Sequence, residues 1–102
     1  MRVYEVRIKR AAMRDLADLE DYLKTVMSQE GANRYIDIMI TEVLSLAVFA
    51  DVYRPSPKAD IKRYHPHACR MVSHNKRWVY IFHVEDDTVI VDRIRPSKTI
   101  AR

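Results

Sequence analysis

The spacing of apolar residues changes between two periods along the chain, and this change limits the possible folds more than any other feature of the sequence. Residues 3–8 alternate apolar and polar side chains, which is the pattern of a half-buried strand. From Arg10 onward the apolar residues recur at intervals of three and four, which indicates one face of an α-helix. That stripe consists of Ala12, Leu16, Leu19, Leu23 and Val26.

A second helical stripe follows the first. It consists of Ala32, Ile36, Met39, Ile40, Val43, Leu46, Ala47 and Ala50. The only glycine of the chain, Gly31, separates the two stripes, and we expect the first helix to stop and the chain to turn at this residue. Two helices joined by so short a turn lie antiparallel, so the sequence predicts a helical hairpin.

Three strand-like segments follow a segment that has no regular period. Residues 51–68 contain three of the four prolines, and we expect them to form an irregular surface loop. Residues 69–73, 77–84 and 89–95 then have the pattern of strands, and Pro96 ends the last of them. Short polar turns between such segments predict an antiparallel meander.

The resulting order, β–α–α–β–β–β, predicts an α+β fold in which an N-terminal strand and a helical hairpin pack on a small antiparallel sheet. One face of this sheet would cover the apolar stripes of the helices. No second helical layer is predicted, so we expect the other face to be bare and to present charged residues. A length of 102 residues fits a single domain with a modest core, and we expect residues 1–102 to form it.

The composition is that of a globular cytoplasmic protein. Hydrophobic residues make up 48% and charged residues 31% of the chain, which argues against disorder. The longest apolar run, residues 43–50, falls far short of the roughly 20 residues of a membrane-spanning helix. The charged N-terminus does not have the pattern of a signal peptide. The single cysteine, Cys69, allows no internal disulfide and is interpreted as a buried core residue.

Positive charge is concentrated in the C-terminal half of the chain, and the net charge is +4. Residues 1–57 contain eight Lys/Arg against nine Asp/Glu, whereas residues 58–102 contain ten against five, so the balances are −1 and +5. A one-sided basic surface attracts polyanions or an acidic protein partner, although such a surface can also serve only solubility.

The histidines give weaker indications of chemistry. His65 and His67 lie two residues apart, but no third ligand is near them in the sequence, and we interpret them as loop residues rather than a metal pair. His83 could be a general acid or base, although a hydrogen-bonded histidine within a strand is the simpler interpretation. With one glycine the chain has no glycine-rich phosphate loop. We expect neither a metal nor a cofactor.

Aromatic and basic residues mark the last three predicted strands. Trp78, Tyr80 and Phe82 share one side of a strand, where they could stack on nucleotide bases, but we expect them in the core because large aromatics dominate small cores. The basic residues on or just beyond the strands are Arg70, Arg77, Arg93, Arg95 and Lys98. They can converge in space, and clustered guanidinium groups would bind the phosphates of RNA or the carboxylates of a protein or inhibitor.

The order of elements and several segments resemble the RelE/ParE superfamily, the toxin components of bacterial toxin–antitoxin modules. The segment CRMVSHNKRWVYIFHVEDDTVIVDRIR resembles the family pattern of an arginine-bearing strand, a turn, an aromatic strand with a tyrosine at Tyr80, an acidic turn and a strand that leads to a basic end. The segments AAMRDLADLEDYL and GANRYIDIMITEVLSLA are similar to the two helices of the family. The resemblance covers essentially the whole chain.

The chain resembles ParE-like members more than RelE-like members, and this resemblance implies a non-enzymatic toxin that poisons DNA gyrase and traps it on cleaved DNA. Its target would be bound by Arg70, Arg77, Arg93, Arg95 and Lys98. RelE-like members cut messenger RNA in the ribosome, and a ribonuclease would here rely on Arg70, Arg77, His83, Arg95 and Lys98. The late tyrosine or histidine of those enzymes has no counterpart after His83. A third alternative is an inactive member that only binds its antitoxin and, together with the antitoxin, operator DNA.

Either subfamily implies a small DNA-binding antitoxin as partner, with operator DNA bound only through that antitoxin and no membrane involved. The acidic C-terminal segment of the antitoxin would lie on the helical hairpin and the sheet edge, where its carboxylates would match the basic residues. The antitoxin-binding residues expected on this basis are Leu16, Leu23, Tyr35, Arg77 and Trp78.

Overall fold

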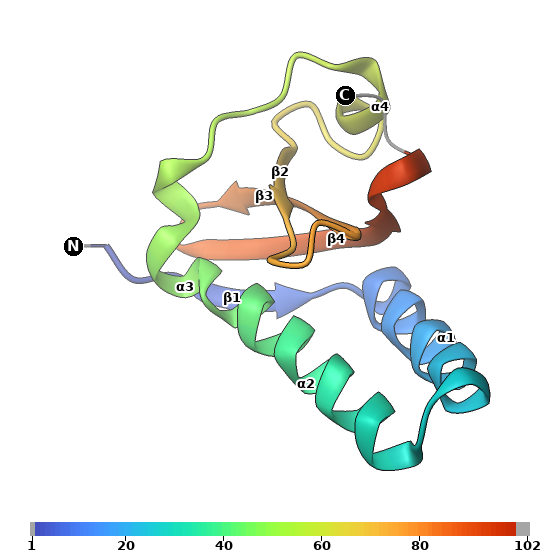
Figure 1. Cartoon of the computed structure of the whole chain (residues 1–102). Helices are drawn as coiled ribbons and strands as arrows, with labels where there is room; N and C mark the ends of the chain where they lie inside the picture. Colours follow the sequence, from blue (N-terminus) through green and yellow to red (C-terminus); the bar gives the residue numbers. More distant parts are fainter. Residues whose placement is uncertain (1, 100–102) are drawn as a thin grey trace.

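The computed structural model describes residues 2–99, which form a four-stranded sheet packed against helices (Figure 1). The strands are β1 (Glu5–Ile8), β2 (Cys69–Val72), β3 (Trp78–Glu85) and β4 (Thr88–Pro96), and their order across the sheet is β1-β4-β3-β2. The last three strands form the predicted antiparallel meander, which confirms the α+β prediction. β1 pairs with β4 in parallel, because the helices and the long connection after them supply the crossover that parallel neighbours need.

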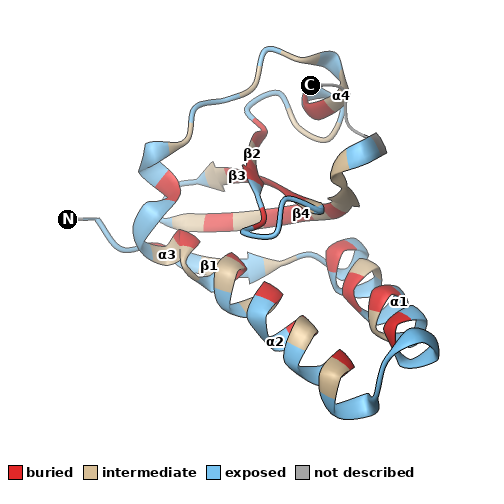
Figure 2. Ribbon diagram, in the orientation of Figure 1, coloured by how far each residue is buried: buried red, intermediate tan, exposed pale blue. Residues whose placement is uncertain are grey.

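The two helical stripes form α1 (Arg10–Val26) and α2 (Gln29–Leu44), and the second continues through α3 (Leu46–Phe49) and the 3-10 helix η1 (Ala50–Val52). The side of α1 and of α2 that faces the core is buried and the outer side is exposed, as Figure 2 shows. A tight turn joins α1 to α2, so the helical hairpin is confirmed. Among the described residues, no helix combines the length and the apolar character that crossing a membrane requires.

The prediction that the first helix stops at Gly31 is wrong. α1 ends at Val26, and Ser28 is the N-cap of α2, where its Oγ accepts a hydrogen bond from the N–H of Gly31 (3.0 Å). Gly31 therefore lies in the first turn of α2. A Cβ at this position would lie 3.2 Å from the Ser28 Oγ, so the glycine leaves room for the capping hydroxyl.

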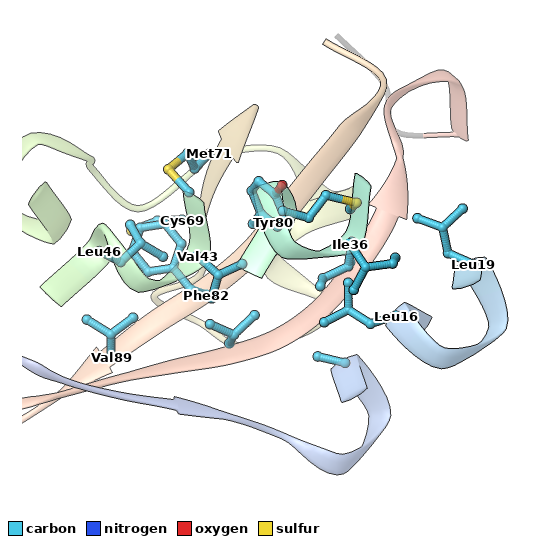
Figure 3. Close-up of a cluster of buried hydrophobic side chains, with 14 of the residues drawn as sticks. Leu16, Leu19, Ile36, Val43, Leu46, Cys69, Met71, Tyr80, Phe82 and Val89 are labelled. Atoms are coloured by element: carbon cyan, nitrogen blue, oxygen red, sulfur yellow. The ribbon is translucent and has the colours of Figure 1, made fainter. Parts of the chain in front are cut away.

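The main core fills the space between the helices and one face of the sheet. Leu16 of α1 and Phe82 of β3 point into the same cluster in Figure 3. Tyr80 and Phe82 are fully buried, and Trp78 packs against the cluster with part of its side chain exposed. The predictions that these three aromatic residues and Cys69 belong to the core are confirmed.

The opposite face of the sheet is not bare, which corrects the expectation from the sequence. Val79 and Ile81 of β3 form a second, smaller core with Ile61 and Ala68 of the connecting segment. That segment contains a short helix, α4 (Ala59–Lys62), which carries Ile61. Ile61 and Ala68 therefore cover part of this face of the sheet. They lie in a segment without a regular apolar spacing, so the periodicity of the sequence did not predict this cover.

Candidate functional site

The turn between β2 and β3 is held by its own side chains. The Oγ of Ser73 accepts a hydrogen bond from the N–H of Trp78 (3.0 Å) and donates one to the Oδ1 of Asn75 (2.7 Å). The same Oδ1 accepts a hydrogen bond from the N–H of Arg77 (3.0 Å). Lys76 adopts a left-handed backbone with φ of 64°, which residues with a Cβ adopt rarely. The exposed side chains of Lys76 and Arg77 thus project from a defined backbone.

The end of β4 is fastened to this turn. Pro96 is the register partner of Trp78. The next residue, Ser97, donates its N–H to the carbonyl of Arg77 (2.9 Å) and its hydroxyl to the carbonyl of Lys76 (2.7 Å). Ser97 begins the 3-10 helix η2 (Ser97–Thr99), which carries Lys98. These contacts place Lys98 beside the basic residues of the turn, although the two segments are distant in the sequence.

Two adjoining grooves flank the turn. Groove 1 has a volume of about 560 Å³ and is lined by Arg70, Val72, Ser73, His74, Lys76, Val79 and Ser97. Groove 2 has a volume of about 420 Å³ and is lined by Lys76, Arg77, Trp78, Pro96, Ser97 and Lys98. The grooves share Lys76 and Ser97, so they adjoin on the surface of the protein. We call the surface of the two grooves the cationic surface and define it by Arg70, Lys76, Arg77 and Lys98.

Within the described part of the chain, residues 2–99, nothing neutralises the charge of the cationic surface. None of the described carboxylates lines either groove. Within residues 2–99 the ion pairs involve Arg2, Lys9, His83 and Arg93, and none involves a residue of the cationic surface. Four unpaired cations beside an apolar floor are therefore available to an anionic ligand.

Arg93 and Arg95, which the sequence grouped with this set, lie in different surroundings. Arg93 donates two hydrogen bonds to the carboxylate of Asp15 in α1 (2.8 and 3.0 Å), and Asp15 also accepts the N–H of Ile94 (2.9 Å). The bond to Asp15 raises the pKa of Arg93, whose charge is thus committed to the fold. Arg95 lines a third groove of about 290 Å³ that also contains Asp15 and Asp18. Arg93 is therefore bound within the fold, whereas Arg95 lies in a groove that adjoins groove 2 and shares Trp78 and Pro96 with it. The convergence of all five basic residues on one target stays a prediction.

Sequence reasoning missed Lys76, which joins the two grooves. The only signal was its place beside Arg77 in the turn HNK, where a lysine is ordinarily a solvated residue. Its role depends on the left-handed backbone and on the docking of Ser97, and neither has a sequence pattern of its own.

Helix α2 fixes the aromatic wall of groove 2. The hydroxyl of Tyr35 accepts a hydrogen bond from the Nε1 of Trp78 (3.0 Å). Further along α2, the carboxylate of Glu42 accepts one from the buried hydroxyl of Tyr80 (2.5 Å) and another from the N–H of His74 (2.9 Å). Burial and the bond to Glu42 raise the pKa of Tyr80, so its hydroxyl remains a donor. The helix therefore holds both the turn and the indole in place.

His83 is not available for acid–base chemistry in the grooves. Its side chain is 2% exposed, and its Nδ1 lies 2.7 Å from the Oδ2 of Asp92. The other oxygen of Asp92 lies 3.1 Å from the Nζ of Lys9. The interpretation of His83 as a hydrogen-bonded strand residue is confirmed. The role that a ribonuclease would require of it finds no support in this geometry.

One group of potential metal ligands occurs within residues 2–99, namely His65, His83 and Glu85. The rings of His65 and His83 are stacked, with centroids 3.7 Å apart and planes 1° from parallel. An imidazole binds a metal in its own ring plane, so an ion in the plane of one ring would lie well outside the plane of the other. In addition, the Nδ1 of His65 accepts the N–H of His67 (3.0 Å). This arrangement does not fit a metal ion.

The expected antitoxin contacts fall into two groups. Leu16 and Leu23 are each 5% exposed within the main core, so the structure does not offer them to a partner. A small protein needs the apolar stripe of its own helix for folding, so Leu16 and Leu23 are left out of the contacts proposed below. Arg77 and Trp78 line groove 2, and Tyr35 is hydrogen-bonded to Trp78. All three side chains are at least partly exposed.

Comparisons with known proteins agree with this architecture. The family model described as "ParE toxin of type II toxin-antitoxin system, parDE" matches residues 6–101. The chromosomal ParDE toxin–antitoxin system of P. aeruginosa has a structurally similar chain, with a TM-score of 0.78, 17% sequence identity, and coverage of 92% of this chain and 96% of that one. The RelBE2 toxin–antitoxin complex of Mycobacterium tuberculosis gives a TM-score of 0.54 at 17% identity, covering 94% and 93%. No curated protein sequence matches significantly.

Proposed function

The chain belongs to the ParE toxin family of type II toxin–antitoxin systems, and we propose that it acts by inhibiting DNA gyrase and thereby blocks replication. The ParE resemblance implies a toxin that traps gyrase on cleaved DNA and hydrolyses no bond itself. The target would be bound through the cationic surface, because Lys76, Arg77 and Lys98 are exposed, Arg70 is partly exposed, and none of the four forms an ion pair within residues 2–99. Arg93 is not part of this proposal, since its guanidinium is bound to Asp15.

The observation that carries the proposal is the contrast between the cationic surface and His83. The cations Arg70, Lys76, Arg77 and Lys98 line two adjoining grooves, and no carboxylate of the described residues lines either one. The strand histidine that could have supplied acid–base chemistry is instead buried against Asp92. Exposed charge without this catalytic group favours binding over hydrolysis.

The antitoxin is proposed to act by covering the same surface. An acidic C-terminal segment would compete with the target for the cations of groove 2, and Tyr35, Arg77 and Trp78 are its proposed contacts. Operator DNA would be bound by the antitoxin, and the toxin would join that complex through it. In this proposal the cationic surface binds gyrase when the antitoxin is absent, and the antitoxin covers the surface when it is present.

Purified chain added to DNA gyrase in a supercoiling reaction tests the proposal. We expect supercoiling to decrease and cleaved DNA to accumulate in the gyrase complex. The charge-removing double variant Arg77→Gln/Lys98→Gln should restore most of the supercoiling. The matched control is Arg34→Gln, which removes an exposed cation of α2 outside the grooves and should inhibit like the parent chain. Unimpaired gyrase at high toxin concentration would refute the proposal.

A second function, cleavage of messenger RNA in the ribosome, has one observation in its favour. His74 lines groove 1 together with Arg70 and Lys76, so an accessible imidazole lies near two cations. Such a set could supply proton transfer and phosphate binding. In this alternative His74, and not His83, would be the required histidine. Message cleavage that is lost in His74→Gln but retained in His83→Gln would establish it.

A further inference from the structure

We propose that groove 2 binds a single-stranded polynucleotide directly, with the indole of Trp78 as a stacking platform for a base and the cationic surface as its phosphate contact. This inference goes beyond gyrase inhibition, since it assigns the cationic surface a nucleic-acid ligand in addition to the gyrase target. DNA and RNA strands share the chemistry that the groove would recognise.

The first argument is the position of Trp78 among the cations. Trp78 lines groove 2 together with Lys76, Arg77 and Lys98, and it also borders the third groove beside Arg95. The ring is only partly covered by the core, so part of it is open to a ligand. A positively charged groove with an aromatic side chain in its wall is the arrangement by which proteins bind single strands without sequence preference.

The second argument is that the indole is held in place before a ligand arrives. Its N–H is bound to the hydroxyl of Tyr35 (3.0 Å), and its backbone is tied to Ser73 within the turn. Pro96, its register partner in β4, lines the same groove and gives it a rigid second apolar element. A ring that is already fixed loses little conformational entropy when a base stacks on it.

The third argument distinguishes a polynucleotide from an acidic protein segment. An acidic segment and a single strand can both pair with the cations of groove 2, but only the strand repeats a planar base beside each phosphate that can stack on the partly exposed Trp78 next to Arg77 and Lys98. The two grooves adjoin at Lys76 and Ser97, so a strand that crosses from one groove to the other would meet Arg70, Lys76, Arg77 and Lys98 with its phosphates. The repeating phosphate and base of a single strand match this alternation of charge and aromatic surface.

Trp78 is the only tryptophan of the chain, so its fluorescence reports on the proposed site alone. The purified chain is titrated with single-stranded DNA and, separately, with single-stranded RNA of matched sequence. We expect quenching of the tryptophan emission by at least one of them, because a stacked base quenches indole. The logarithm of the affinity should fall with the logarithm of salt concentration with a slope of about −3, from about −0.7 for each of the four phosphate contacts. The two titrations decide which strand is the better ligand.

Charge variants then locate the site. Lys76→Asn with Lys98→Gln should reduce the slope by about 1.4 and weaken binding at low salt, while Arg34→Gln should bind like the parent chain. Trp78→Leu, followed by anisotropy of a labelled strand, should weaken binding about fivefold or more. If that variant fails to fold, the quenching and salt dependence of the parent chain still decide the matter.

Two results would overturn the inference. One is the absence of binding to either strand at low ionic strength. The other is equal binding and equal quenching by poly-glutamate, which would assign the surface to an acidic protein partner. Gyrase supercoiling is measured on the same preparation. Inhibited gyrase without strand binding would refute only this inference, and strand binding with unimpaired gyrase would refute only the proposed function.

Discussion

The hydroxyl of Ser97 donates a hydrogen bond to the main-chain carbonyl of Lys76 at 2.7 Å, and this contact fastens the end of β4 to the turn between β2 and β3. The N–H of Ser97 adds a second bond, to the carbonyl of Arg77. Residues from two distant segments thereby line the same grooves. The cationic surface is a product of this docking rather than of any one segment.

Replacing Lys76 separates the charge of this residue from its backbone conformation. Lys76 has φ of 64°, a conformation that costs about 1–2 kcal/mol for a residue with a Cβ and little for glycine. We therefore expect Lys76→Gly to be as resistant to urea as the parent chain or more so, and yet to inhibit gyrase less. Lys76→Asn, which also tolerates this conformation, should behave in the same way. Loss of stability in both variants would show that the lysine side chain supports the fold.

Asp15 of α1 is expected to stabilise the fold through its hydrogen bonds to Arg93 and Ile94 of β4. Its carboxylate accepts two hydrogen bonds from Arg93 and one from the N–H of Ile94. Asp15→Ala leaves these donors unpaired, so the free energy of unfolding should fall by about 1–3 kcal/mol. The control is Asp18→Ala, an exposed neighbour in α1, which should change it by less than about 0.5 kcal/mol. Urea unfolding of both variants measures the difference, and equal effects would contradict the assignment.

Tyr35→Phe tests whether α2 positions the indole of Trp78. The hydroxyl of Tyr35 accepts hydrogen bonds from the Trp78 Nε1 and from the Nδ2 of Asn75, and phenylalanine can accept neither. We expect a shift in the tryptophan emission maximum and a loss of about 1 kcal/mol in stability. Tyr53→Phe keeps the ring that contacts Phe82, alters a tyrosine that shares no groove with Trp78, and should leave the emission unchanged. Identical spectra for the parent chain and Tyr35→Phe would argue against this role.

Much of the fold follows from the sequence because its elements are strongly periodic. The stripe that contains Leu16 is long enough to define α1, and the alternation around Tyr80 defines β3 and its core face. The prediction that the first helix stops at Gly31 relied on the common occurrence of glycine at helix ends. Here the capping hydroxyl of Ser28 decides where α2 begins. The cover on the second sheet face was not predictable, since Ile61 lies in a segment without periodicity.

The site was only partly predictable for a different reason. Sequence can show that basic residues accumulate near the last strands, but not which of them are already paired. Arg93 looks like Arg77 in the sequence, and only the approach of Asp15 from α1 removes it from the set. Likewise, His83 cannot be told from an accessible histidine until Asp92 is found beside it. Whether such a residue is available to a ligand depends on its pairing with residues from distant segments of the chain.

Stability is expected to fall in mild acid through His65. Burial, and secondly the charge of the neighbouring His83, lowers the pKa of His65 below its ordinary value of 6.5. In mild acid the unfolded chain therefore binds a proton at His65 that the folded chain does not bind. The contribution of His65 to the stability of the fold is complete above about pH 6.5 and decreases as the pH falls below that value. His65→Phe keeps a ring to stack on His83 and removes the titrating group. Its melting temperature should therefore decrease less than that of the parent chain between about pH 7.5 and about pH 5.5. An equal decrease in both proteins would assign the pH dependence to other groups.

The most direct test of the central claim is pulse labelling of DNA and protein synthesis in a bacterial host after induction of this chain without an antitoxin. The account predicts that DNA synthesis stops early while protein synthesis continues, and that Arg77→Gln/Lys98→Gln delays this arrest. Early loss of protein synthesis with continuing DNA synthesis would contradict the account and favour message cleavage through His74. Undiminished synthesis of both would contradict it as well, and would leave a chain that only binds its antitoxin.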